Sequence, residues 1–149
     1  MSCITLRFLA EPSTVNFGGK VHGGTVMKWI DEAGYACATR WACQYCVTVS
    51  VGAIRFERPV RIGDLVEVEA RLAYTGTTSM NISVEVRAGD IKTGEMQKIT
   101  ACLVVLVAVD DDGKKMPVPH WQPATPGDMA LAERVKAHLD AARNMPSAV

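Results

Sequence analysis

Two features near the N-terminus combine residue types that can do acid–base or nucleophilic chemistry. A loop that contains Asn16, His22 and the pair Gly23-Gly24 leads into an expected helix, and Asp31 follows about two turns along it. The helix needs no charge at this point, because a buried stripe with i, i+3, i+4, i+7 spacing is already formed by Val26, Trp29, Ile30, Ala33 and Cys37. Asp31 lies at the edge of that stripe. It is therefore either a solvated surface residue or a carboxylate held in a cleft as a general base or nucleophile.

Length and charge exclude several classes of protein. The chain has 149 residues, which is enough for one domain that buries about two-thirds of its unfolded surface. Lys plus Arg and Asp plus Glu number 16 each, so no net positive field attracts nucleic acid. We find neither an apolar run of about 18 residues nor the layout of a signal peptide, and we therefore expect a cytoplasmic protein that does not bind membranes.

The five cysteines are odd in number, which favours free thiols in a reducing compartment. Cys43 and Cys46 have the CxxC spacing of a redox or zinc motif. No second CxxC or His pair exists to complete four zinc ligands, so we expect no metal. The pair also lies between an expected helix and an expected strand, whereas a redox CxxC opens a helix after a strand. We interpret both residues as structural thiols.

Apolar periodicity predicts one long helix and an antiparallel set of strands. A strand over residues 4–9 precedes the loop, and the helix extends from about Thr25 to Trp41. Its small residues allow a close approach to a flat surface; they are Ala33, Gly34, Ala36, Cys37 and Ala38. Strand patterns with period-two alternation follow at residues 47–56, 66–72, 80–86 and 97–109. Gly52 interrupts the phase of the first of these and predicts a β-bulge.

The chain beyond residue 109 reads as a polar turn, a Pro-rich connector and a final helix. We expect Asp128 to cap this amphipathic helix, whose apolar residues are Met129, Leu131, Ala132, Val135 and Leu139. We divide the chain into a domain at residues 1–116 and an appended connector and helix at residues 117–149. The last strand is apolar on both faces over residues 101–109, so Val104, Leu106 and Ala108 predict that something covers the outer face of the sheet.

Three groups of residues stand in a specific order along the chain. The first is Asn16, Gly23-Gly24 and Asp31, with Asn and Asp 15 positions apart; the second is Val47-Thr48-Val49 leading through Ile54-Arg-Phe56 to Pro59-Val60-Arg-Ile-Gly63-Asp64; the third is Thr75-Gly76-Thr77-Thr78-Ser79. Together, over roughly residues 12 to 110, they resemble the hotdog-fold acyl-CoA thioesterases, in particular the cytosolic acyl-CoA hydrolases. The resemblance implies an α+β hotdog fold, in which an antiparallel sheet wraps around one long central helix, and the C-terminal helix is added to it.

The resemblance also implies a site that hydrolyses an acyl-CoA thioester. Asp31 then acts as general base on water, or as a nucleophile that forms an acyl-enzyme anhydride. Backbone N–H groups at Gly24 meet the oxyanion, and Asn16 orients the water or holds the carbonyl. Contacts to substrate or CoA are expected from His22, Gly23, Thr48, Arg58, Arg61, Thr77, Thr78 and Ser79. The two arginines suit phosphate oxygens. No cofactor is expected beyond the coenzyme A of the substrate.

The spacing within the helix predicts a site shared between chains. Gly24 and Asp31 are seven residues apart, or about 10 Å along the axis, which is too far for both to serve one carbonyl. Two helices antiparallel across a dyad would bring Asp31 of one protomer to Gly24 and Asn16 of the other, with two equivalent sites per dimer. We expect at least a homodimer, and the resemblance favours a trimer of dimers.

Two other functions fit the same fold. A hotdog hydratase or dehydratase pairs a carboxylate with a histidine on or beside the helix, whereas here His120 and His138 lie in the tail. A non-catalytic acyl-CoA-binding module would have no use for both Asn16 and Asp31. A transcriptional sensor would need a DNA-binding segment ahead of Ile4, and we expect none.

Overall fold

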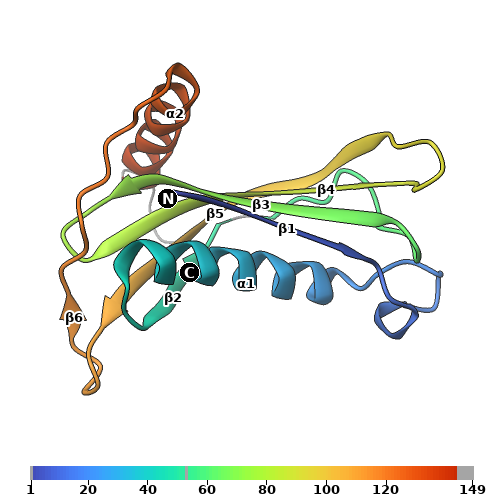
Figure 1. Cartoon of the computed structure of the whole chain (residues 1–149), viewed down its shortest axis with the longest axis horizontal. Helices are drawn as coiled ribbons and strands as arrows, with labels where there is room; N and C mark the ends of the chain where they lie inside the picture. The colour runs from blue at the N-terminus through green and yellow to red at the C-terminus, as the bar shows by residue number, and fades with distance from the viewer. Residues whose placement is uncertain (1, 53, 144–149) are drawn as a thin grey trace.

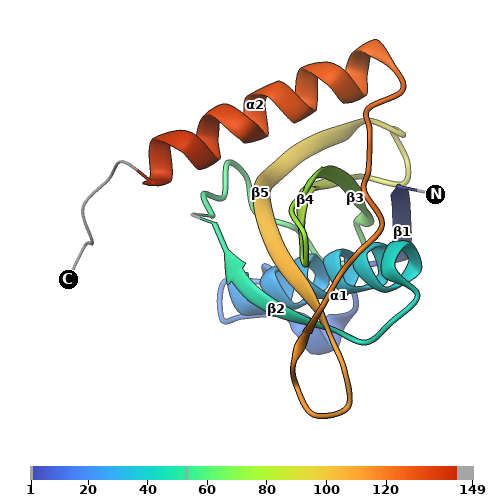
Figure 2. The ribbon, with the colours of Figure 1, turned by 90° about the vertical axis from the view of Figure 1, so that its left-hand side faces the viewer.

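One antiparallel sheet curls around one long helix. The structure is a computed structural model, and it describes residues 2–52 and 54–143. Helix α1 (Gly23–Ala42) lies on the concave face of the sheet, and helix α2 (Pro126–Arg143) lies on the opposite face (Figures 1 and 2). The other elements are β1 (Cys3–Leu9), the 3-10 turn η1 (Pro12–Thr14), β2 (Cys46–Val51), β3 (Leu65–Thr75), β4 (Ser79–Gly89), β5 (Met96–Val109) and β6 (Lys115–Met116). The strand order is β1-β3-β4-β5-β2, and β6 pairs with β5. The predicted wrapping of an antiparallel sheet around one helix is confirmed.

The hydrophobic core fills the space between α1 and the concave face of the sheet. Alternate residues of the central strands are buried, and they include Val66, Val68, Ala70, Leu72, Met80, Ile82, Val84 and Val86. At the middle of α1, a Cβ on Gly34 would lie 3.5 Å from Val104 and 3.6 Å from Leu106, which are ordinary van der Waals distances, so this face of α1 packs directly on β5. Trp29 is buried and packs edge-on against Phe8, with ring centroids 4.8 Å apart.

The contacts of Gly34 also correct the prediction about the last strand. Val104 and Leu106 face α1 on the concave side, so their burial does not require a cover on the outer face. The outer face of β5 carries Leu103, Val105 and Val107 instead, because side chains alternate along a strand. Helix α2 approaches this face near Leu103, where both line one groove. The prediction that β5 is apolar on both faces is thus correct, but the prediction that Val104, Leu106 and Ala108 lie on the outer face is wrong.

A β-bulge is present in β2, but not at Gly52 as predicted. Thr48 pairs with Leu106 and Ser50 pairs with Val105, so the extra residue is Val49. Gly52 lies just beyond the end of β2 and donates its N–H to the carbonyl oxygen of Leu103 at 2.8 Å. A Cβ at Gly52 would lie 3.3 Å from that oxygen. The glycine therefore permits a close approach of two backbones, and the interrupted alternation in the sequence marked that approach rather than the bulge.

Helix α2 is capped by Thr125 and not by Asp128. The hydroxyl oxygen of Thr125 accepts a hydrogen bond from the Asp128 N–H at 3.0 Å, which is the geometry of an N-cap. Asp128 instead accepts a hydrogen bond from Arg71 of β3 at 2.9 Å and so ties α2 to the sheet. Burial alone would raise the pKa of Asp128, but the hydrogen bonds with Thr125 and Arg71 lower it. Neither α1 nor α2, the helices of the described chain, has the apolar length needed to cross a membrane.

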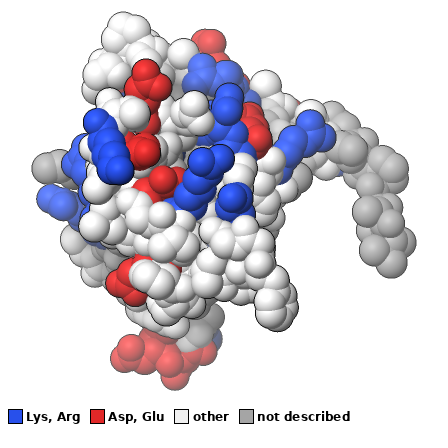
Figure 3. All heavy atoms as spheres, turned by 90° about the vertical axis from the view of Figure 1, so that its right-hand side faces the viewer, with Lys and Arg blue, Asp and Glu red and all other residues white. Residues whose placement is uncertain are grey.

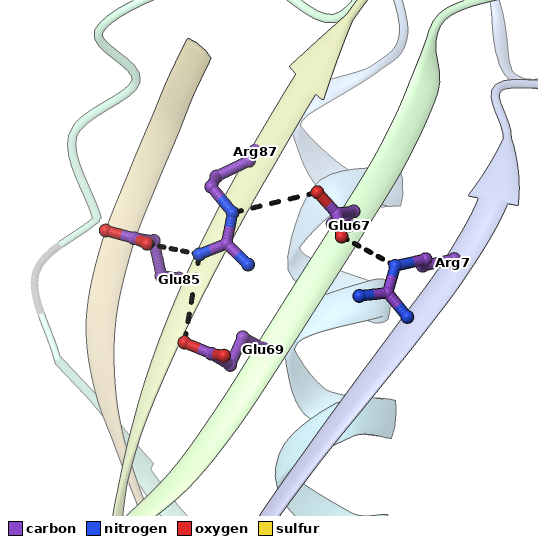
Figure 4. A network of polar contacts seen from close by, with 5 residues as sticks. All are labelled: Arg7, Glu67, Glu69, Glu85 and Arg87. Atoms are coloured by element: carbon purple, nitrogen blue, oxygen red, sulfur yellow. Dashed lines mark hydrogen bonds and ion pairs between the residues drawn. The ribbon is translucent and has the colours of Figure 1, made fainter. Parts of the chain in front are cut away.

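The outer face of the sheet beside α2 is charged. Arg7 Nε lies 2.6 Å from Glu67, and Arg87 Nη1 lies 3.8 Å from Glu69 and also contacts Glu85 (Figure 4). These side chains link β1, β3 and β4 across the sheet, although partly exposed ion pairs contribute little individually to stability. The outer face is therefore polar on three strands and apolar on β5.

Candidate active site

The predicted site residues form two clusters that are apart in one protomer. The glycine cluster comprises residues at the start of α1 and the segment beside it: Asn16, His22, Gly23, Gly24, Arg58 and Arg61. Antiparallel bridging of Lys20 with Arg61 and a hydrogen bond from Val21 N to Val60 O hold these two segments together. The carboxylate cluster comprises Asp31 on α1 and Thr48 on β2. Thr77, Thr78 and Ser79 lie just before and at the start of β4, with β5 between them and β2, and they make no hydrogen bond to Asp31 among the described residues. Thr48 and Met80 both pair with Leu106, which places β2 and the start of β4 at one level of the sheet.

Asn16 organises the loop that precedes α1. Its Oδ1 accepts hydrogen bonds from the backbone N–H groups of Gly18, at 2.9 Å, and Lys20, at 3.1 Å. Because Oδ1 must be the acceptor for both amides, the orientation of the side-chain amide is fixed and Nδ2 is left to donate. Asn16 can therefore give a hydrogen bond to a bound oxygen atom, while its own oxygen is engaged by the loop.

The first turn of α1 presents unoccupied backbone donors. The helix begins at Gly23, two residues earlier than predicted, and the carbonyl of His22 accepts from the N–H groups of Thr25 and Val26. Within the described chain, the N–H groups of Gly23 and Gly24 have no acceptor, as expected for a helix start. A Cβ at Gly24 would meet no atom within 4 Å, so a ligand can approach this backbone freely. These amides and the positive end of the helix dipole suit a developing oxyanion.

Asp31 is exposed and is held by one hydrogen bond. Thr48 Oγ1 donates to Asp31 Oδ1 at 2.6 Å, a contact between α1 and β2 that sequence reasoning did not anticipate. In the part of the chain that the structure describes, Oδ2 has no hydrogen-bond partner and is free to meet a water or a carbonyl carbon. The neighbouring Glu32 differs, because it turns to Lys28 at 3.8 Å. The carboxylate of Asp31 is thus oriented by Thr48 without being neutralised by a cation.

Exposed apolar side chains surround Asp31 on α1 and on the adjoining edge of the sheet. This apolar border consists of Met27, Tyr35, Tyr45, Val49 and Val51, which are 39–61% exposed. Tyr35 and Tyr45 contact each other edge-on, with ring centroids 6.3 Å apart. The outward edge of β2 has no neighbouring strand among the described residues. Both an apolar patch of this kind and an open strand edge are typical of protein interfaces.

Arg58 and Arg61 lie at the end of the molecule formed by the β4–β5 hairpin and the loops beside it. They line a cavity of about 290 Å³ together with Asp64, Asp90 and Glu95. Figure 3 views this end, where basic and acidic side chains are interspersed. Asp64 Oδ2 also accepts the backbone N–H of Arg61 at 2.9 Å. Carboxylates therefore line the same cavity as the two arginines, but no ion pair joins either guanidinium to them among the described residues.

Sequence reasoning did not assign Phe56 to the site. The ring of Phe56 lies over the start of α1, and a Cβ at Gly23 would come 3.4 Å from it. Phe56 was expected to continue a strand, but it lies beyond the end of β2, at Val51. Phe56 belongs to the second group of residues that carried the resemblance, and this membership could have indicated a place near the site.

The histidines and the buried thiols do not join Asp31. His22 precedes α1 and is exposed, His120 is exposed in the connector, and His138 is on α2 at the opposite face of the sheet. Burial raises the pKa of Cys37 to about 12 and that of Cys102 to about 11, and it also raises the pKa of Cys46. These three thiols are therefore protonated at neutral pH and unsuited to nucleophilic attack.

Comparisons with known proteins identify the family and the fold. A model of the thioesterase superfamily matches residues 18–95. The acyl-CoA thioester hydrolase YciA of Salmonella typhimurium is 40% identical over 119 residues, which are 78% of this chain and 90% of that protein. An apo-hexameric acyl-CoA thioesterase has a TM-score of 0.89 and 32% identity, with 93% of this chain and 89% of that chain covered. The chain belongs to the thioesterase superfamily.

A further solved structure carries information about ligands. The acyl-CoA hydrolase of Staphylococcus aureus, in complex with butyryl coenzyme A and coenzyme A, has a TM-score of 0.87 and 26% identity, and the match covers 95% of this chain and 86% of that chain. Two mutants of that enzyme replace one Asp and one Asn by Ala, at positions that are 15 residues apart. Asn16 and Asp31 have the same spacing here.

Proposed function

We propose that this protein is an acyl-CoA thioester hydrolase whose two sites are each built from the carboxylate cluster of one protomer and the glycine cluster of its partner. The observation that carries the proposal is that each cluster offers the catalytic group that the other lacks. Asp31 is an oriented carboxylate with a free oxygen, and the start of α1 offers free N–H donors. Neither cluster has both parts, and hydrolysis of a thioester needs both.

The proposed chemistry follows from these groups. The thioester carbonyl oxygen accepts hydrogen bonds from the amides of Gly23 and Gly24, which stabilise the negative charge as the tetrahedral intermediate forms. Asp31 takes a proton from the attacking water, or attacks the carbonyl carbon itself to form an anhydride that water then opens. In both routes the C–S bond breaks and coenzyme A leaves as a thiolate that takes up a proton. No cofactor is required beyond the substrate's own coenzyme A.

The apolar border supports the pairing of two protomers at α1 and β2. A second copy placed across a dyad here would cover the exposed Tyr45 and Val49 and would approach the open edge of β2. Gly24 and Asp31 are seven residues apart and so lie on one face of α1. A dyad that crosses this face between them would bring the start of one α1 to Asp31 of the other. Burial of the border and completion of the site would then be one event.

Asn16 is proposed to donate from Nδ2 to the substrate carbonyl or to the attacking water. We expect Asn16→Asp to lower kcat/KM by about 10²-fold or more, the usual scale for the loss of one such donor, although Asp keeps the oxygen that holds Gly18 and Lys20. Asn16→Ala should lose at least as much. Steady-state kinetics of both variants test this. If Asn16→Asp retained wild-type activity while Asn16→Ala did not, the role of Asn16 would be confined to the loop.

We further propose that dimers assemble into a hexamer. The apo-hexameric acyl-CoA thioesterase and the hexameric thioesterase y2039 from Yersinia pestis are similar in fold. In this chain the outer face of β5 leaves Val105 partly exposed, whereas Val107 is buried within the protomer and Leu103 lies beside α2, so any contact between dimers would lie around Val105 and α2. Light scattering should give a mass near six times 16.1 kDa across the micromolar range. A mass near twice 16.1 kDa would remove the hexamer and leave the dimer.

The function itself is tested by a thiol-release assay with saturated acyl-CoA esters from acetyl to palmitoyl. We expect release of free coenzyme A from at least part of the panel, without added metal and in the presence of EDTA. The activity would be cytoplasmic, where free thiols and acyl-CoA coexist. Failure to hydrolyse any ester of the panel by the intact oligomer would overturn the proposal.

A further inference from the structure

A cavity opens directly beside Asn16 and the start of α1. It measures about 310 Å³, and its inner wall is formed by Val21, Val26, Val60, Ile99 and the ring of Phe56. The four aliphatic residues are at most 6% exposed, so the wall behind the cavity is closed core. Polar side chains, Asn16, Lys20, Glu57 and Arg58, lie among the remaining lining residues. The cavity is therefore an open recess with a closed apolar wall on one side and polar side chains on the other, and it adjoins the donors proposed to hold the thioester carbonyl.

The chemistry of the wall selects one arm of an acyl-CoA. The pantetheine arm carries two amides, and these would lose their hydrogen bonds to water against the aliphatic wall, where Val21, Val26, Val60 and Ile99 offer no side-chain partner. A saturated acyl chain has no such groups and gains from burial of each methylene.

We infer that this recess receives the acyl chain of the substrate and that Phe56 is the residue that sets its capacity. The inference rests on the proposed function. A cavity of about 150 Å³ holds one benzene ring, so a recess about twice as large holds roughly a dozen carbon atoms. Phe56 is the one aromatic side chain of the wall, it is 43% exposed, and it leans on Gly23. Its replacement can change the recess without disturbing the core.

Opposite substitutions at Phe56 provide the test. Wild type, Phe56→Ala and Phe56→Trp are compared by thiol release across saturated esters from acetyl to palmitoyl. Wild type should prefer chains of up to about twelve carbons. Phe56→Ala should raise the ratio of kcat/KM for long chains over short chains by about tenfold or more. Phe56→Trp should lower this ratio by a similar factor. This is the scale of discrimination when a few methylene groups of a substrate are added to, or excluded from, an apolar pocket. Ile91→Ala is the matched control, because Ile91 is an exposed apolar residue of the β4–β5 hairpin outside the recess.

The outcomes separate the inference from the function on which it rests. Opposite shifts of the chain-length ratio in the two variants, with none in Ile91→Ala, support the acyl recess. A change in KM of the same factor for every ester, with the ratio constant, would place Phe56 against the pantetheine arm and overturn the inference. An unchanged profile would overturn it as well. The chain-length ratio can be measured only if wild type hydrolyses part of the panel. If wild type hydrolyses none of the esters, the proposed function itself has failed.

Discussion

Asp31→Asn is expected to lower kcat/KM for a preferred acyl-CoA by about 10²–10⁴-fold, the scale associated with a general acid–base group. The amide oxygen of Asn can still accept the hydrogen bond from Thr48, so the local geometry at α1 and β2 should persist. Asp31 is exposed, and its replacement leaves no cavity in the core. The loss should therefore fall on catalysis and not on folding, and it should affect esters of all chain lengths.

Glu32→Gln provides the matched control for this change. Glu32 is the next carboxylate on the same helix and is exposed, and its ion pair with Lys28 is the only polar side-chain contact that it makes among the described residues. We expect its activity to remain within about twofold of wild type, because surface pairs of this kind contribute little. Circular dichroism and thermal unfolding check that both variants fold. Turnover of Asp31→Asn close to that of wild type would remove Asp31 from the mechanism.

Mixing two inactive variants is expected to restore activity. In Asn16→Ala every site lacks the amide, and in Asp31→Ala every site lacks the carboxylate. A heterodimer of the two has one site with neither residue and one site with both, so it should show about half the activity of a wild-type dimer. Random pairing of equal amounts makes half of the dimers heterodimers, and the mixture should therefore reach about a quarter of wild-type activity.

The mixing experiment needs proof that subunits have exchanged. Two affinity tags, one on each variant, allow the heterodimer to be isolated and assayed directly. A mixture of Asp31→Ala with Asp31→Asn serves as the control and should stay inactive, because neither subunit can supply the carboxylate. An isolated heterodimer of Asn16→Ala and Asp31→Ala without activity would show that each site takes both residues from one chain.

The alternation of apolar residues was sufficient to predict the helix and the strands, because one face of each element packs in a single core. It did not identify which face of β5 lies inward, because residues on both faces of this strand are apolar and the alternation therefore does not distinguish them. The inward face of β5 is identified only by the structure, in which Val104 and Leu106 lie against Gly34 of α1. The interrupted phase at Gly52 likewise reported a backbone contact with Leu103 that periodicity cannot distinguish from a bulge.

The candidate site could be predicted in its parts but not in its contacts. The spacing of Gly24 and Asp31 showed that one helix cannot bring them together, and the structure places them in separate clusters. The bond from Thr48 to Asp31 joins residues 17 positions apart through the register of β2 against β5, which sequence spacing does not reveal. The fixed orientation of the Asn16 amide depends on the path of its loop, which glycines allow but do not specify.

The open edge of β2 affects how long a newly synthesised chain persists before it pairs with a second one. A protomer that has folded but not yet paired carries a bare strand edge and the aromatic rings of Tyr35 and Tyr45 in contact with water. Such a surface invites aggregation or capture by chaperones. Pairing would remove that hazard at the same moment as it assembles the catalytic groups. Orphan subunits would thus be both inert and short-lived, and the cell's supply of active enzyme would be set by encounter of two chains rather than by folding alone.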